Sequence, residues 1–389
     1  MGYMKSVLFS CYGLGIGGIE KCLVNLINAM PEDEFDIDLL LMNPEYTLLK
    51  TIKRRVNILD SFEYVMNTTD YLHELAIRGG IVKNFAKTIR YILFRVLVKL
   101  RIKPWKVFSA AGKKYDIAVA YSQNDYSPYY IVDKIKANRK ILWYHNGAYE
   151  KNHRDYTRDK SYYPKFDSIV AVSQDCKKML TEKFNDVAQK VITLMNFYDV
   201  DDIRLKSLEP PGVNFNSEFV NIVTVARLTE EKGADIALAA CKNLIDCGKK
   251  IRWYWIGEGN RIGNIEKEIA ASHLQETFIL MGNKANPYPY MGAADIYVQP
   301  SYYEAYSTTV FEAKALGKVI VATDVGGMRD QIETKKNGII VPVNAVAISD
   351  AICMLLNDDK LYEQIRSSVQ QTTFDSESNM EAYRRSVFE

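Results

Sequence analysis

The sequence repeats one pattern along its length: a short apolar stretch of strand length is followed by a stretch with helical spacing. Val7–Phe9 precedes Glu20–Met30, whose apolar residues recur on one side of a helix. Phe219–Val225 starts the same pattern again, before Asp235–Leu244. Strands that alternate with helices form parallel sheets that helices cover on both faces. The predicted fold class is therefore α/β, with two Rossmann-like parallel-sheet domains.

The other predicted strands fall on both sides of a polar break. They are Asp36–Leu41, Ile117–Ala120, Lys140–Tyr144, Ser168–Val172, Val191–Leu194, Ile251–Ile256, Phe278–Met281, Ile296–Val298, Val319–Ala322 and Ile339–Val341. The break, Asp199–Ser217, contains Pro210-Pro211-Gly212 and is typical of a linker. We therefore assign residues 1–198 to an N-terminal domain and 199–372 to a second domain. Residues 373–389 form a C-terminal segment, and the sequence leaves open whether it crosses back to the first domain.

Composition argues against several classes of protein. The chain of 389 residues is 48% hydrophobic and 25% charged, as in globular proteins. Its net charge of +2 is too small to produce the positive electrostatic field that attracts nucleic acid. The six cysteines and four histidines are scattered without a CxxC pair, so no structural zinc site is expected. No stretch reaches the ~20 apolar residues of a transmembrane helix. We expect a cytoplasmic protein.

Charged residues follow the predicted strands of the second half. Arg227 and Lys232 come directly after its first strand and precede a glycine and a helix, an arrangement that can hold a diphosphate. Glu304 follows Ile296–Val298, and Glu312 lies eight positions later inside the next predicted helix. Free N–H groups at the start of that helix attract anions, and nearby carboxylates can accept hydrogen bonds from hydroxyls. The combination favours a sugar or ribose joined to a phosphate.

The two cations, and two further features of the first half of the chain, each allow another interpretation. Glu230 and Glu231 lie between the two cations and could neutralise them in a solvated turn. The loop Gly13–Gly18 fits the dinucleotide fingerprint GxGxxG, but the next strand does not end in the acidic residue that a nicotinamide dinucleotide needs. His145 follows the strand at Lys140–Tyr144, where a ligand would lie, although single histidines are often structural.

Three motifs together resemble the retaining glycosyltransferases of family four, over nearly the whole chain and most strongly over residues 219–345. The first motif is Arg227-Leu228 with Glu231-Lys232-Gly233, and the second is Gly257-Glu258-Gly259. In the third, seven residues separate Glu304 from Glu312-Ala313, and Gly317 follows. Those enzymes have the GT-B fold, in which two such domains face each other across a cleft. The resemblance implies an acceptor-binding N-terminal domain and a donor-binding C-terminal domain.

The resemblance also implies roles for individual residues. The implied catalytic residues are His145, Glu304, Arg227 and Lys232, and the implied donor-binding residues are Gly17, Gly18, Arg227, Lys232, Gly282, Asn283, Glu304, Ala305, Tyr306, Ser307, Thr308 and Glu312. The two cations would hold the diphosphate, Glu312 would bind the ribose, and Glu304 would contact the transferred sugar. The segment at Gly282 would approach the base.

The implied activity is retaining, metal-independent transfer of a hexose-type sugar from a nucleotide sugar, by resemblance a UDP-sugar, to a glycan or lipid-linked acceptor. Bacterial cell-surface polysaccharide synthesis would use such an enzyme, and no cofactor is expected. The alternatives are an epimerase-like enzyme on nucleotide sugars and a nucleotide-sugar-binding protein without transfer activity.

Residues 78–114 form a basic arm, since no acidic residue occurs from Leu75 to Tyr115 and lysines and arginines alternate with aliphatic residues. A helix of this kind can lie on an anionic membrane, with Trp105 at the interface and the protein at the inner face of the cell membrane. A core-packing helix with a solvated basic face is the alternative. Elsewhere, Asp36-Ile37-Asp38 spells the metal signature DxD, but its alternation predicts two solvent-facing acids.

Overall fold

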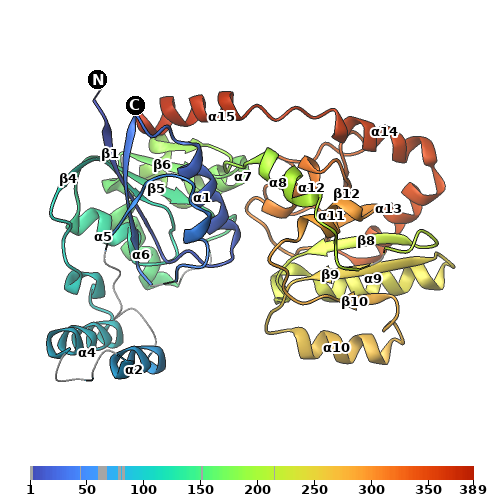
Figure 1. Cartoon of the computed structure of the whole chain (residues 1–389), viewed down its shortest axis with the longest axis horizontal. Coiled ribbons are helices and arrows are strands. Elements are labelled where there is room, and N and C mark those ends of the chain that lie inside the picture. The colour runs from blue at the N-terminus through green and yellow to red at the C-terminus, as the bar shows by residue number, and fades with distance from the viewer. Residues whose placement is uncertain are drawn as a thin grey trace. The chain divides into compact units, whose positions relative to one another are not determined.

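The computed structural model describes residues 3–43, 45–59, 68–77, 80, 84–149, 152–213 and 215–389. Arg78 and Lys83 of the predicted basic arm lie outside these residues. The chain divides into two compact units. The first comprises Met1–Val172, Cys176–Tyr198 and Ser376–Glu389, and the second Ser173–Asp175 and Asp199–Asp375. Each unit is built on a parallel sheet, which confirms the predicted fold class (Figure 1).

The described part of the first unit holds a parallel sheet in the order β3-β2-β1-β4-β5-β6-β7. Its strands are β1 (Lys5–Cys11), β2 (Phe35–Leu41), β3 (Asn57–Leu59), β4 (Lys114–Ala120), β5 (Lys136–Tyr144), β6 (Ser168–Ala171) and β7 (Val191–Thr193). Its helices include α1 (Gly18–Ala29), α2 (Thr68–Ile77), α4 (Phe85–Leu100), η3 (Pro104–Val107), α5 (Ser127–Lys134), α6 (His153–Tyr162), α7 (Gln174–Lys183), α15 (Ser376–Tyr383) and η7 (Arg384–Phe388). The strand order reverses between β1 and β4, which is where open α/β sheets bind ligands.

The second unit repeats this design in the order β10-β9-β8-β11-β12-β13. Its strands are β8 (Val220–Val225), β9 (Ile251–Ile256), β10 (Phe278–Leu280), β11 (Ile296–Gln299), β12 (Val319–Thr323) and β13 (Ile339–Val341). Its helices include α8 (Val200–Ser207), η6 (Glu230–Lys232), α9 (Ala234–Asp246), α10 (Ile262–Ala271), α11 (Tyr288–Ala293), α12 (Thr308–Ala315), α13 (Ala345–Asn357) and α14 (Asp359–Gln370). Here the order reverses between β8 and β11.

The predicted linker is partly helical. Helix α8 occupies its first half, and the Asp199 side chain caps the helix by accepting a hydrogen bond of 2.9 Å from the Asp202 N–H. Arg204 Nε donates to the carbonyl of Ala315 at 3.1 Å, and Asn286 Nδ2 donates to the carbonyl of Lys206 at 2.9 Å. The first half of this segment is therefore packed into the second unit.

Two surface predictions were wrong because burial depends on distant parts of the chain. Trp105, predicted at a membrane interface, is fully buried: its ring centroid lies 4.5 Å from that of Tyr129, and its Nε1 donates to Asp133 at 2.8 Å. Of the two acids of the DxD sequence, Asp36 is exposed as predicted. Asp38, however, is only 2% exposed and accepts a hydrogen bond of 2.6 Å from the Tyr115 hydroxyl. Strand β2 is an interior strand of a parallel sheet, and such strands are covered on both faces.

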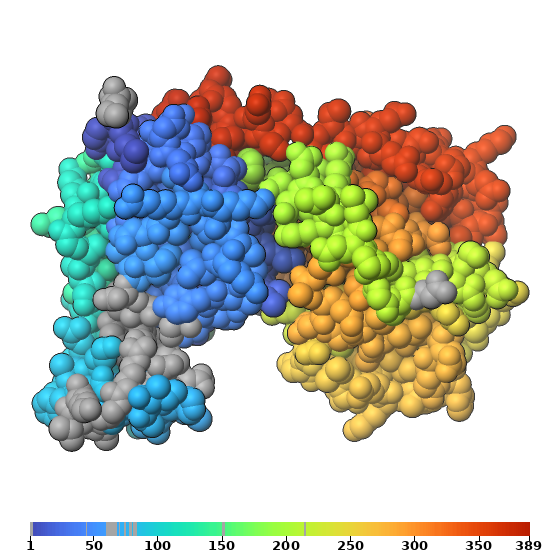
Figure 2. Space-filling model, in the orientation of Figure 1, coloured from blue at the N-terminus to red at the C-terminus, as the bar shows by residue number. Residues whose placement is uncertain are grey.

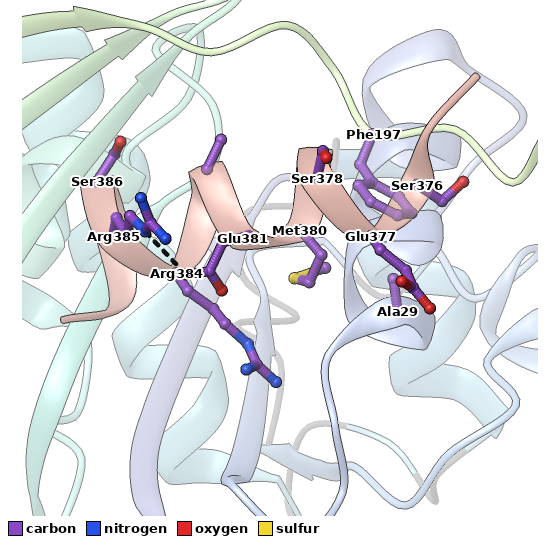
Figure 3. A pocket seen from close by; sticks show the side chains of 11 residues that line it. Ala29, Phe197, Ser376, Glu377, Ser378, Met380, Glu381, Arg384, Arg385 and Ser386 are labelled. Carbon is purple, nitrogen blue, oxygen red and sulfur yellow. Dashed lines mark hydrogen bonds and ion pairs between the residues drawn. The ribbon is translucent and has the colours of Figure 1, made fainter. Parts of the chain in front are cut away.

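The C-terminal segment packs on the first unit. Lys5 Nζ donates to the carbonyl of Phe388 at 2.8 Å, and Arg384 pairs with Glu34 at 2.6 Å. A pocket of about 1040 Å³ lies along this segment. Figure 3 shows its lining, which consists of Ala29, Phe197 and side chains of α15 and η7. Its lining contains none of the predicted site residues. Among the helices of the described residues, none combines the length and apolar character needed to cross a membrane.

Candidate functional site

The loops after β8 and β11 meet where the strand order of the second unit reverses. Lys232 Nζ lies 2.8 Å from Glu304 Oε1, and both side chains are largely buried. Gly233 makes this approach possible: its φ is +68°, and a Cβ there would lie 2.0 Å from the carbonyl oxygen of Pro300. The backbone N–H of Tyr302 also donates to the carbonyl of Glu231 at 2.9 Å. The sheet thus joins the predicted cation and the predicted carboxylate.

A buried network holds the Glu304 carboxylate. Its Oε1 accepts hydrogen bonds from Ser301 Oγ at 2.8 Å and from Gln299 Nε2 at 3.2 Å, besides the Lys232 contact. The amide oxygen of Gln299 in turn accepts from the hydroxyls of Tyr297 at 2.6 Å and Thr309 at 3.0 Å. Within the described residues every hydrogen bond to this carboxylate ends on Oε1. Its Oε2 is therefore left to accept a hydrogen bond from a ligand.

Glu312 lies inside α12 with 3% of its surface exposed. Its Oε1 accepts a hydrogen bond of 2.9 Å from the hydroxyl of Tyr288, the first residue of α11. Ser307 begins the helix, since its Oγ accepts from the Val310 N–H at 3.4 Å. The loop from Glu304 to Ser307 therefore leads directly to the N-terminus of α12, where backbone N–H groups favour an anion.

Arg227 is held much more loosely than Lys232. Its side chain is 70% exposed and pairs with Glu231 at 3.0 Å. Partial burial raises the pKa of Glu231, but hydrogen bonds from Thr229 and from its own backbone, with the charges of Arg227 and Lys232, lower it below its ordinary value overall. An exposed pair of this kind is weak and costs little to exchange. Arg227 can therefore turn from Glu231 to an arriving anion.

Gly282 and Asn283 follow β10, two strands from β8 at the same edge of the sheet. The Glu258 N–H donates to Asn283 Oδ1 at 3.1 Å, and Asn283 Nδ2 donates to Glu258 Oε2 at 3.3 Å. The structure therefore brings Gly282, Asn283, Arg227, Lys232, Glu304 to Thr308, and Glu312 to the carboxyl edge of one sheet.

Gly17, Gly18 and His145 belong to the first unit. Gly17 precedes α1 in the loop after β1, and His145 follows β5. Burial lowers the pKa of His145 to about 3, although a hydrogen bond with the Tyr121 backbone acts in the opposite direction. Its Nε2 is buried without a hydrogen-bond partner among the described residues. His145 is thus a neutral imidazole whose Nε2 can accept a hydrogen bond from a hydroxyl.

Sequence reasoning missed three contributors: Gln299, Ser301 and Tyr288. Gln299 could have been found from the sequence, because it is a polar residue at the end of an apolar strand. No local signal marks Tyr288, because it reaches Glu312 across 24 residues of sequence. In the part of the chain that the structure describes, no cluster of three or more His, Cys, Asp or Glu side chains could hold a metal ion.

Comparison with solved structures places the fold in a class. HepE of Anabaena, solved with UDP and glucose, matches with a TM-score of 0.72 and 18% identity over 100% of both chains. The chain has the GT-B fold of two parallel-sheet α/β domains. Residues 207–372 match the family described as group 1 glycosyl transferases.

Curated relatives match parts of the chain. One is the N-acetylgalactosamine-N,N'-diacetylbacillosaminyl-diphospho-undecaprenol 4-alpha-N-acetylgalactosaminyltransferase of Campylobacter jejuni, 28% identical over 201 residues, which are 51% of this chain and 53% of the relative. Another is a putative teichuronic acid biosynthesis glycosyltransferase of Bacillus subtilis, 31% identical over 170 residues, which are 41% of this chain and 40% of the relative. The chain therefore spans about half the length of the curated relatives it matches, or less.

Proposed function

We propose that this protein transfers a sugar from a nucleoside diphosphate sugar to a glycan or lipid-linked acceptor, with retention of the anomeric configuration. One observation carries the proposal: the contact between Lys232 and Glu304, at the strand reversal of the second unit. A cation and a carboxylate at this position can bind the phosphate and the hydroxyls of one ligand. The match of residues 207–372 to group 1 glycosyl transferases supports it.

The site would stabilise the leaving group. When the bond from the anomeric carbon to the diphosphate oxygen breaks, negative charge develops on the diphosphate. Lys232, Arg227 and the N–H groups at the start of α12 would bind that charge. Donors already in place at the developing charge lower the barrier without reorganisation. In this proposal no metal or other cofactor is required.

Other residues would position the donor. Glu312 would accept hydrogen bonds from the ribose hydroxyls, with its carboxylate oriented by Tyr288. The Oε2 atom of Glu304 and the backbone of Ala305, Tyr306, Ser307 and Thr308 would contact the transferred sugar and its phosphate. Gly282 and Asn283 would contact the base. For Gly17, Gly18 and His145 we propose contacts with the donor phosphates and the transferred sugar, in a first unit that binds the acceptor.

UDP is the proposed carrier, since HepE was solved with UDP. The Campylobacter relative's name specifies a diphospho-undecaprenol acceptor, and the Bacillus relative is assigned to teichuronic acid biosynthesis. We propose a lipid-linked or glycan acceptor in cell-surface polysaccharide synthesis, with which both names agree. We further propose that the protein acts at the cytoplasmic face of the membrane.

The test is to incubate the protein with a panel of UDP-sugars and candidate acceptors, and to measure free UDP and glycosylated product together. Transfer gives both in equal amounts. An epimerase-like enzyme would convert the donor without releasing UDP, and a binding protein would leave it intact. Either result, obtained with an acceptor that a related enzyme uses, would contradict the proposal.

A further inference from the structure

Helix α4 is fixed to the first unit by one face only. Tyr91 and Phe94 are buried there. The Tyr91 ring stacks on Tyr71 of α2, with centroids 3.9 Å apart and planes within 2°, and its hydroxyl donates to Thr68 at 2.9 Å. Phe94 packs against Phe108, with ring centroids 5.9 Å apart. Figure 1 shows α2 and α4 side by side, away from the sheet of their unit.

The opposite face of α4 is apolar and exposed. The α4 stripe consists of Phe85, Ile89, Ile92, Leu93, Val96 and Leu100, which are between 45% and 64% exposed. At about 100° per residue, these positions fall within a sector of about 100° on the side away from Tyr91 and Phe94. Exposed apolar side chains in one continuous patch mark an interaction surface. Figure 2 shows α4 (cyan) on the surface of the first unit.

The charges around the stripe are of one sign. Arg95 and Lys99 border one edge of the stripe and Arg90 the other, and all three are exposed. No acidic residue occurs between Leu75 and Tyr115. The partner should therefore be apolar beneath and anionic at its surface. A second copy of the chain fits poorly, because two such faces would bring arginines and lysines together.

We propose that the α4 stripe docks on the surface of a bilayer that contains anionic lipids. A helix with an apolar face and basic flanks lies in the plane of the membrane interface, with the apolar side chains among the acyl chains and the cations at the lipid phosphates. The structure thus separates the two interpretations left open by the sequence. Tyr91 and Phe94 lie on the face of α4 that packs against the rest of the first unit, whereas the six apolar side chains of the α4 stripe are exposed to solvent. This inference rests on α4 alone and holds whether or not the second unit binds a nucleotide.

The first experiment is co-sedimentation of the full chain with vesicles. One set contains phosphatidylcholine only, and the other replaces a third of it with phosphatidylglycerol. We expect binding to the anionic vesicles that weakens as salt is raised. Leu93→Glu with Val96→Glu should reduce binding more than tenfold, and each of Arg95→Gln and Lys99→Gln by about fivefold.

A matched control uses exposed apolar residues of the second unit. Leu208 and Val346 are 80% and 60% exposed, so Leu208→Glu with Val346→Glu makes the same chemical change elsewhere and should bind as the wild type does. Thermal unfolding should be the same for both double variants and the wild type, since all four side chains are exposed. Unchanged vesicle binding by the α4 variant, or absence of wild-type binding to anionic vesicles, would overturn the proposal.

A second measurement reports where the stripe lies. The four native tryptophans are fully buried, so Phe85→Trp adds an exposed one on the stripe. Its emission should shift to the blue with anionic vesicles and be quenched by lipids brominated in the acyl chain. Vesicle binding without either change would place the contact elsewhere. Light scattering that shows a wild-type dimer, dissociated by the α4 double variant, would assign the stripe to self-association instead.

Discussion

Lys232 and Arg227 are predicted to bind the same diphosphate but to differ in their effect on stability. Lys232 pairs at 2.8 Å with Glu304, whose side chain is 9% exposed, whereas the 70% exposed Arg227 pairs with a partly exposed Glu231. Replacing each cation by alanine therefore separates ligand binding from structural support. Lys242 is the control, because it pairs with Asp246 at 2.7 Å on the exposed surface of α9.

The structure sets the magnitude of each effect. Lys232→Ala leaves the Glu304 carboxylate with two neutral donors, Ser301 and Gln299, and should cost ~1–3 kcal/mol of unfolding free energy. In a unit of this size, each kcal/mol corresponds to about 2–4 °C in Tm. Arg227→Ala removes an exposed pair worth ~0–1 kcal/mol, so its Tm should change little. Each variant loses a charged hydrogen bond to the diphosphate, about 1.5–3 kcal/mol, which weakens UDP binding about 10- to 150-fold.

Calorimetric titration with UDP and thermal unfolding of the same samples measure both quantities. We expect Lys232→Ala to lower affinity and Tm, Arg227→Ala to lower affinity alone, and Lys242→Ala to change neither. The refuting result is a folded Lys232→Ala variant with lower Tm and a UDP Kd within twofold of the wild type. Lys232 would then be a structural partner of Glu304 and nothing more.

Three further predictions follow from single side chains. Glu312→Ala should weaken UDP binding and transfer at least about tenfold but leave the affinity for 2',3'-dideoxy-UDP nearly unchanged, and an equal loss for both ligands would contradict a ribose contact. The pKa of His145 is about 3 in the folded protein and ordinarily 6.5, so between these pH values only the unfolded state binds the proton. The free energy of unfolding therefore falls as the pH drops below about 6.5. In urea titrations between pH 7.5 and 5, His145→Gln should lose about 2 kcal/mol less of this free energy than the wild type. Asp38→Ala should lower the free energy of unfolding by ~1–3 kcal/mol, because it leaves the buried hydroxyl of Tyr115 without an acceptor. UDP binding should be the same in this variant as in the wild type, and the same with or without EDTA. Loss of UDP binding in either test would instead support a metal role for the DxD sequence.

The elements that sequence reasoning predicted are those with local signals. An apolar stretch that ends in a charged residue identifies both a strand and its carboxyl end, and this located Arg227, Lys232 and Glu304 at the edge of one sheet. The spacing from Glu304 to Glu312 crosses a single loop and helix start, so it too could be recognised from sequence alone.

The contacts that it missed join residues far apart along the chain. The amide of Gln299 bridges Tyr297, Thr309 and Glu304 only because a strand end and a helix start meet. Trp105 was misplaced because its burial depends on α5 and α6. For α4 the periodicity indicated an amphipathic helix, but it could not tell which apolar side chains face the protein.

We propose above all that the loops after β8 and β11 hold a nucleoside diphosphate, and a crystal structure of the protein with UDP is the most direct test. We expect the diphosphate within hydrogen-bond distance of Lys232 and Arg227, and the ribose hydroxyls within hydrogen-bond distance of Glu312. UDP bound away from all three side chains, at full occupancy, would contradict it.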